Sequence, residues 1–195
     1  MIDLLVLRSK VSAFESVWFP TTGENQKFWF QARNAKFHGI IEKLCHECFN
    51  PVTQLQSSGI APSQLVTDLV GAGWSDGEML ILAIMIDQMP RNALAINYGQ
   101  FSDADRMNVT DNIDDSFALA LADYLRSNTA LKSVSDVRIV CFFSLIFRHS
   151  NRFDEARDVL LSLKMNEENE ANPQLPPLAE KFWNETNKRQ DALGM

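Results

Sequence analysis

Apolar residues recur along most of the chain at the spacing of one helix face. A first stripe runs from Phe28 to Cys48, with apolar residues three, four or seven positions apart: Phe30, Phe37, Ile41, Leu44 and Cys48. This period places the side chains on one side of an α-helix. We expect Asn50-Pro51 to end that helix. A short further helix is expected to begin near Pro62, because proline suits a first helical turn.

The most apolar segment of the chain follows Ser75-Asp76-Gly77-Glu78. In this capping-box pattern the serine hydroxyl accepts a hydrogen bond from the Glu78 amide, and the glutamate side chain accepts one from the serine amide. A helix is therefore expected to begin here. Its residues from Met79 to Ile86 are apolar on every face, which is typical of a helix buried among others. Pro90 lacks an amide donor, so we expect the helix to end at Met89.

Helical patterns also fill the second half of the chain. Asp114 or Asp115 is expected to cap the first of these helices, and Ser133 or Ser135 the next, which is strongly apolar. The first is expected to end near Ser127-Asn128 and the second around Arg148-His149-Ser150, and two further helices are predicted over 153–164 and 178–189.

The remaining segments lack helical periodicity. Residues 92–115 are rich in aspartate and are predicted to form an extended acidic loop, and residues 166–177 a linker to the C-terminal helix. No strand-like alternation of useful length appears. The pattern therefore predicts a single all-α domain over residues 1–195, built from antiparallel helices.

Charge and composition narrow the choice of partners and location. The chain has 18 basic and 25 acidic residues and a net charge of −7, which disfavours binding to nucleic acid or to an anionic membrane. The apolar run from Met79 to Ile86 is too short to span a bilayer. The first residues lack the basic region and cleavage site of a signal peptide. We expect a cytoplasmic protein with no nucleic-acid or membrane partner.

Cys45-His46-Glu47-Cys48 has the thiol spacing of half a zinc site. A structural zinc site needs four ligands, and no second cysteine or histidine pair is present. We interpret the thiols as part of an apolar helix face and expect no metal. Motifs for nucleotide binding, acyl transfer and metalloprotease chemistry are also missing, so no cofactor is expected.

Two polar clusters end the two most apolar helical segments. The first is Asp87-Gln88-Met89-Pro90-Arg91-Asn92, and the second contains Arg148-His149-Ser150. An ionised group drawn into the interior needs partners, and Arg91 is the nearest one for Asp87. One interpretation is structural: Asp87 pairs with Arg91, and His149 is stabilised by the helix C-terminus. In the other, His149 faces Asp87 across a groove.

The groove interpretation assigns roles to particular side chains. His149 and Asp87 are the candidate catalytic residues. The candidate ligand-binding residues are Gln88, Arg91, Asn92, Ser150, Trp29 and Asp115. Trp29 is also explained by burial in the core, since large aromatic rings favour it.

The chain resembles the bacterial DUF924 family, whose members have no assigned function, in segments spread over most of its length. These segments are Val17-Trp18-Phe19, Trp29-Phe30, Trp74, residues 82–92, residues 117–122 and Phe142-Phe143 through His149-Ser150. The Asp-Gln-x-Pro-Arg-Asn sequence at 87–92 is the most specific. The resemblance implies a TPR-like α-α superhelix of helical hairpins. It also implies a polar site that includes Asp87, Gln88, Pro90, Arg91, Asn92, Asp115, His149 and Ser150.

The chain departs from the family pattern in three places. Residues 92–115 form a longer segment than the family's counterpart, and Asn151-Arg152 replaces an acidic pair. The family's C-terminal Gly-Arg-Phe-Pro-His-Arg-Asn stretch is reduced to Arg189-Gln190-Asp191. If that stretch completes an active site in relatives, the activity here is changed or lost.

Three hypotheses of function come from these residues. The first is a helical module that binds a small polar or anionic molecule, or a partner protein, with Arg91 meeting the anion. The second is an enzyme in the same groove, with His149 as acid or base and Arg91 and Asp87 beside it. No convincing nucleophile accompanies this histidine. In the third, the polar residues only hold the fold, and function lies in protein contacts.

Overall fold

The computed structural model describes residues 3–30, 34–97, 113–128, 134–163 and 175–195. Every regular element in these ranges is an α-helix, which confirms the predicted all-α class. The helices are α1 (Leu4–Trp18), α2 (Ala35–Gln56), α3 (Pro62–Gly71), α4 (Asp76–Asn97), α6 (Ser116–Ser127), α7 (Val137–His149), α8 (Phe153–Leu161) and α9 (Pro177–Ala192). They share one apolar core. The TPR-like superhelix stays a prediction.

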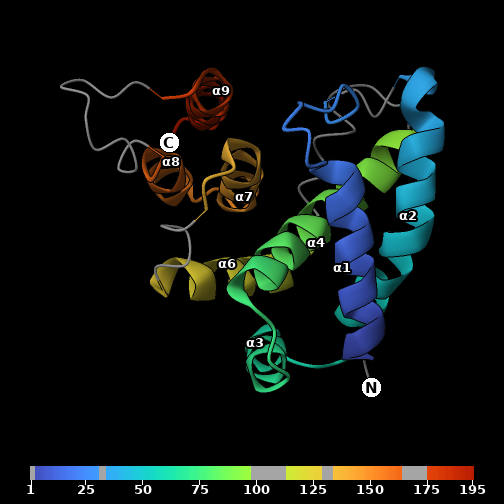
Figure 1. The fold of residues 1–195 in the computed structure, drawn as a ribbon. Coiled ribbons are helices and arrows are strands. Elements are labelled where there is room, and N and C mark those ends of the chain that lie inside the picture. Colours follow the sequence, from blue (N-terminus) through green and yellow to red (C-terminus); the bar gives the residue numbers. More distant parts are fainter. Residues whose placement is uncertain (1–2, 31–33, 98–112, 129–133, 164–174) are drawn as a thin grey trace.

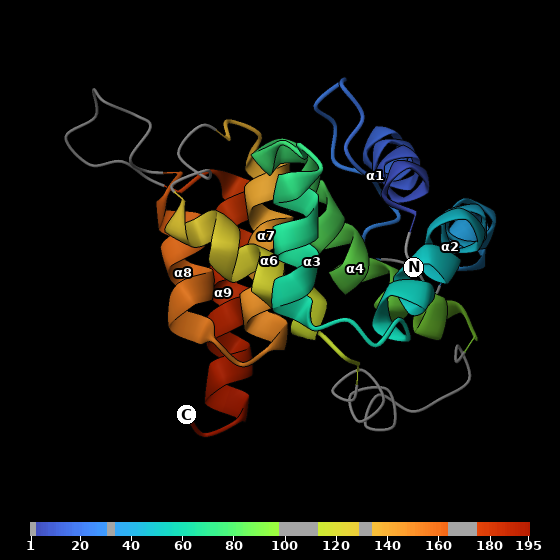
Figure 2. The same cartoon turned by 90° about the horizontal axis from the view of Figure 1, so that it is seen from below.

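Helix α4 lies at the centre of the molecule, with α1 and α2 on one side and α6 to α9 on the other (Figure 1). Figure 2 shows the same division from below, and there α7 and α9 lie next to α8. All residues of α4 from Met79 to Pro90 are buried, as the apolar pattern on every face predicts. Among the described residues, none of the helices has both the length and the apolar character that a membrane crossing requires.

The predicted capping box precedes α4. The Ser75 amide donates to Oε2 of Glu78 at 2.8 Å, and the Glu78 amide donates to Oγ of Ser75 at 3.2 Å. Helix α3 begins at Pro62, as predicted. Local sequence chemistry therefore identifies these two helix starts correctly.

Both predictions that a proline ends a helix are wrong. Pro51 lies inside α2 and Pro90 inside α4. Beyond Pro51, Val52 and Leu55 are fully buried, so the packing of the next turn outweighs the lost amide hydrogen bond. Beside Pro90, two side chains supplement the backbone hydrogen bonds of the helix. Arg91 Nη1 donates to the Asp87 carbonyl at 2.9 Å, and Asn92 Nδ2 donates to the Gln88 carbonyl at 2.8 Å.

Several other boundaries differ from those expected. Residues 92–97 belong to α4 and not to a loop, and residues 98–112 and most of the expected linker lie outside the described residues. Helix α2 begins at Ala35, so Phe30 precedes it. Asp136 caps α7 by accepting from the Arg138 amide, in the role expected of Ser133 or Ser135.

Helix α1 was not predicted, although its pattern is present in the sequence. Its buried residues are spaced four, three and four positions apart: Leu7, Val11, Phe14 and Trp18. Asp3 caps the helix by accepting from the amides of Leu5 and Val6.

Candidate functional site

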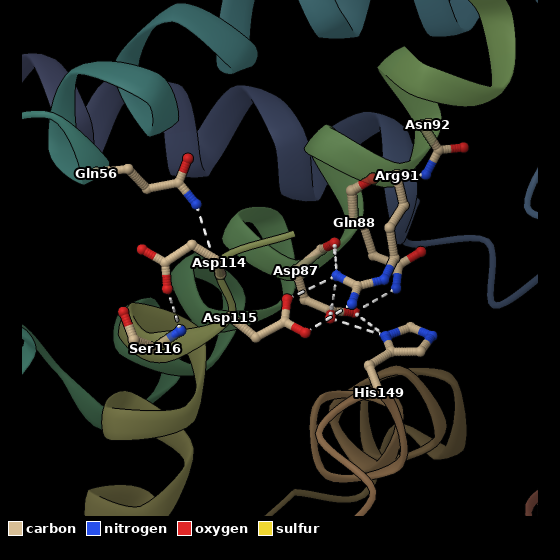
Figure 3. A network of polar contacts seen from close by, with 9 residues as sticks. All are labelled: Gln56, Asp87, Gln88, Arg91, Asn92, Asp114, Asp115, Ser116 and His149. Atoms are coloured by element: carbon tan, nitrogen blue, oxygen red, sulfur yellow. Dashed lines mark hydrogen bonds and ion pairs between the residues drawn. The ribbon is translucent and has the colours of Figure 1, made fainter. Parts of the chain in front are cut away.

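A buried carboxylate, that of Asp87 on α4, stands at the centre of a polar network (Figure 3). Its side chain is 0% exposed. Oδ1 accepts from Arg91 Nη1 at 2.9 Å and lies 2.8 Å from Nδ1 of His149. Oδ2 accepts from Gln88 Nε2 at 2.6 Å and lies 3.1 Å from the same imidazole nitrogen. The two polar clusters, 62 residues apart along the chain at Asp87 and His149, therefore meet at one carboxylate.

Arg91 extends the network from α4 to α6. Its Nη1 and Nη2 donate to the two carboxylate oxygens of Asp115 at 2.8 and 2.7 Å, in a bidentate arrangement. Asp115 occupies the position before α6, but its side chain makes no capping hydrogen bond. Asp114 accepts from the Ser116 amide at 2.9 Å instead. Of the two predicted caps, Asp114 therefore fills that role with its side chain, and Asp115 is committed to Arg91.

The charges of the network set the protonation states of its members. Burial raises the pKa of Asp87, but the charge of Arg91, the charge that His149 carries once it is protonated at low pH, and the hydrogen bonds outweigh burial and lower the pKa to about 2. Burial lowers the pKa of His149, against the opposing effect of Asp87. At neutral pH the network therefore contains an ionised carboxylate and a neutral imidazole. The helix C-terminus alone would favour a charged His149, and here burial outweighs it.

The ionised carboxylate also determines which nitrogen of His149 carries the proton. An ionised carboxylate only accepts hydrogen bonds, so Nδ1 must be the donor to Asp87. This leaves Nε2 with a free lone pair. Nε2 points away from Asp87 (Figure 3), and 14% of the His149 side chain is exposed.

The other predicted site residues have different placements. Asn92 donates to the Gln88 carbonyl and, within the described chain, makes no hydrogen bond to the carboxylate of Asp87. The Ser150 hydroxyl is buried and makes no hydrogen bond within the described part of the chain. Trp29 packs edge-on against Phe142 in an aromatic cluster, and its indole nitrogen donates to the Trp18 carbonyl at 3.0 Å. The structure therefore brings together Asp87, Gln88, Arg91, Asp115 and His149, and Trp29 contributes to the core.

The two cysteines whose side chains are described, Cys48 and Cys141, are buried and free. Among the described residues, no group of three or more histidine, cysteine, aspartate or glutamate side chains could hold a metal ion. Cys48 is buried in the core, as the helix-face interpretation predicts, and burial raises its thiol pKa to about 11. The side chains of Cys45 and His46 lie outside the description.

A cavity of about 610 Å³ lies beside the network, between the C-terminal end of α7 and one face of α9. Its lining residues are Phe30, Arg148, Lys181, Phe182, Glu185, Lys188, Arg189, Ala192 and Leu193. Asp87 and His149 are not among them. Sequence reasoning did not assign this cavity. No local signal in the sequence pointed to it, because α9 carries as many acidic as basic residues.

Comparison with known proteins returned no matching family model, curated protein or solved structure. The resemblance to the DUF924 family thus stays a prediction from the sequence.

Proposed function

We propose that this protein binds a small polar molecule through the exposed edge of the His149 ring. The observation that carries this proposal is the contact of 2.8 Å between Nδ1 of His149 and the buried carboxylate of Asp87. Asp87 fixes both the ring orientation and the tautomer, so that Nε2 is presented as a hydrogen-bond acceptor. The ligand must therefore carry a donor, such as a hydroxyl or an amine.

Arg91 has a supporting role in this proposal. Its terminal nitrogens are engaged by Asp87 and Asp115, so the guanidinium stabilises two carboxylates from α4 and α6. An anionic ligand would have to displace one of them. This differs from the sequence hypothesis, in which Arg91 meets the ligand directly.

An enzyme is the second candidate, and the Asp87–His149 pair favours it. A carboxylate that holds a neutral imidazole is the arrangement of an oriented general base. His149 would then accept a proton at Nε2 from the bound molecule. Among the described residues, no hydroxyl or thiol is hydrogen-bonded to His149, so the nucleophile would have to be water or the substrate itself.

In the structural hypothesis, the network serves only to hold α4, α6 and α7 together. This hypothesis is favoured by the extent to which the charges of Asp87, Arg91 and Asp115 satisfy one another. It differs from the binding and enzyme hypotheses in one prediction: no ligand binds to His149.

The experiment begins with nitrogen NMR of isotope-labelled histidine. We expect the His149 signals of a neutral ring with the proton on Nδ1. A thermal-shift screen of sugars, polyols and amino acids should then identify compounds that stabilise the wild type and move the Nε2 signal. His149→Gln should abolish that stabilisation, and His38→Gln, which alters a histidine outside the network, should retain it.

Three outcomes separate the candidates. Ligands that stabilise His149→Gln as much as the wild type would contradict the proposal. If no compound moves the Nε2 signal, the structural hypothesis is favoured over binding. Conversion of a bound compound that requires His149 would favour the enzyme.

A further inference from the structure

We propose that the cavity between α7 and α9 binds a small organic anion, with Arg148 contacting its carboxylate or phosphate group and Phe30 and Phe182 contacting its apolar body. We call this space the basic cavity. None of its lining residues belongs to the Asp87 network. The inference therefore goes beyond the function proposed for His149 and does not depend on it.

The size of the basic cavity suits a small molecule. Its volume of about 610 Å³ falls within the range of 300–1,000 Å³ typical of ligand pockets. Both walls are helical: α7 contributes Arg148, and α9 contributes residues from Lys181 to Ala192. The two helices pack directly on each other. The charged groups are thus attached to a rigid frame.

The lining is strongly basic, in contrast to the acidic chain as a whole. Glu185 is its single acidic residue, and four basic residues surround it: Arg148, Lys181, Lys188 and Arg189. Glu185 is paired with Lys188 at 2.8 Å. Lys181 Nζ lies 4.5 Å from the centroid of the Phe30 ring, in a cation–π contact, and shares the attraction of Glu185 with Lys188 and Arg148. The local field therefore attracts an anion despite the net charge of −7.

Arg148 is the group that most clearly lacks a partner. Within the described part of the chain, its guanidinium makes no hydrogen bond and no ion pair, and its Nε is buried without an acceptor. Burial, together with the positive charge of Arg189, lowers the pKa of Arg148 to about 10, and outweighs the attraction of the Asp87 and Glu185 carboxylates, neither of which contacts the guanidinium directly. A buried donor without an acceptor is costly, and a carboxylate or phosphate fits the planar guanidinium in a bidentate arrangement.

The rest of the lining is apolar and indicates the other half of the ligand. Phe30 is 53% exposed although it stacks on Phe142 and packs edge-on against Phe182. Ala192 and Leu193 add aliphatic surface at the end of α9. Free inorganic phosphate would leave these rings in water. An anion with an aromatic or aliphatic body would cover them.

Isothermal titration calorimetry tests the proposal with three probes: phenyl phosphate, phenylacetate and inorganic phosphate. We expect the two organic anions to bind more tightly than inorganic phosphate, and the stronger of them shows which anionic group is preferred. Arg148→Gln should weaken the binding of both by at least about tenfold, the loss of one charge-assisted contact. Arg126→Gln is the matched control, because it removes the same charge at the surface pair with Asp158.

Two further variants make the test specific. Phe30→Ala should weaken phenyl phosphate and leave inorganic phosphate unchanged, since it removes only apolar contact. His149→Gln should bind phenyl phosphate like the wild type, so failure of the His149 proposal and failure of this one are distinguishable. Equal binding by Arg148→Gln and Arg126→Gln would overturn the proposal, as would the absence of binding by either organic anion in the wild type.

Discussion

Two neighbouring regions of the molecule treat buried charge in opposite ways. Arg148 and His149 are consecutive residues in the last turn of α7, about 100° apart around the helix axis. His149 contacts the network of Asp87, in which the charges of Asp87, Arg91 and Asp115 are paired with one another. Arg148 lines the basic cavity, where its guanidinium has no such partner among the described residues.

The difference separates charge that holds the fold from charge that is available to a ligand. Breaking a compensated buried pair leaves its remaining charge in a medium of low dielectric constant, so such pairs are sensitive to substitution. A buried cation such as Arg148, which has no direct hydrogen-bond or ion-pair partner among the described residues, already bears much of that cost in the folded state. Replacing Arg148 should therefore not lower the free energy of unfolding, although it should abolish the binding of an anion in the basic cavity.

Asp87→Ala should produce the largest loss of stability in the molecule's polar groups. The substitution removes the carboxylate that holds Arg91, Gln88 and His149, and breaking a buried pair costs about 3–5 kcal/mol. Urea denaturation followed by circular dichroism measures the free energy of unfolding. The matched control is Asp123→Ala, which breaks an exposed pair with Arg152 and should cost at most about 1 kcal/mol. Equal losses in the two variants would contradict the assigned role of the buried network.

Asp115→Asn should have an intermediate effect. It leaves an amide nitrogen facing the Arg91 guanidinium and disrupts the bidentate contact between α4 and α6, at a cost of about 1.5–3 kcal/mol. Asp158→Asn, which alters the exposed pair with Arg126, is the control and should be nearly neutral. The same denaturation series measures both. If Asp115→Asn leaves the unfolding free energy unchanged, the contact with Asp87 alone is enough to hold Arg91.

The sequence predicted the network better than the cavity, and the reason is physical. Asp87 and His149 each follow a long apolar run, and a polar group that follows a buried apolar run must find partners in the interior. That requirement is visible in the residues themselves. Their convergence on one carboxylate still depended on how α4 and α7 pack, which the sequence left open between two interpretations.

The basic cavity has no such local signal. Its walls come from Phe30, Arg148 and the last helix, segments that are far apart along the chain and are ordinary in composition. The two prolines show the same limit for the fold. A proline in the sequence indicates only that one amide donor is missing. Whether the helix continues past it depends on tertiary packing, which here buries Val52 beyond Pro51 and Ala93 beyond Pro90.

The pH dependence of stability should reveal the neutral state of His149. Its pKa is lowered from 6.5 in the folded protein by burial, so below pH 6.5 the unfolded chain takes up the proton first. The contribution of His149 is thus complete above that pH and is lost as the pH falls through its folded pKa. Asp87, with its pKa near 2, stays ionised over this range.

Urea denaturation of the wild type and of His149→Gln between about pH 8 and pH 5 measures this effect. The difference in unfolding free energy between the two proteins should shrink as the pH falls. His38→Gln serves as the control for loss of a histidine elsewhere. A difference that grows on acidification would show a charged His149 stabilised by Asp87, the reverse of the assigned state.

Arg148→Met should have the smallest effect and tests the comparison most directly. Because the guanidinium has no direct hydrogen-bond or ion-pair partner in the described chain, replacing it with an apolar side chain of similar length should leave the unfolding free energy within about 0.5 kcal/mol of wild type, or raise it. Arg91→Met is the matched variant and should lose several kcal/mol, since it strands two carboxylates. Similar losses in the two variants would mean that Arg148 is held as firmly as Arg91. The distinction between charge used by the fold and charge open to a ligand would then fail.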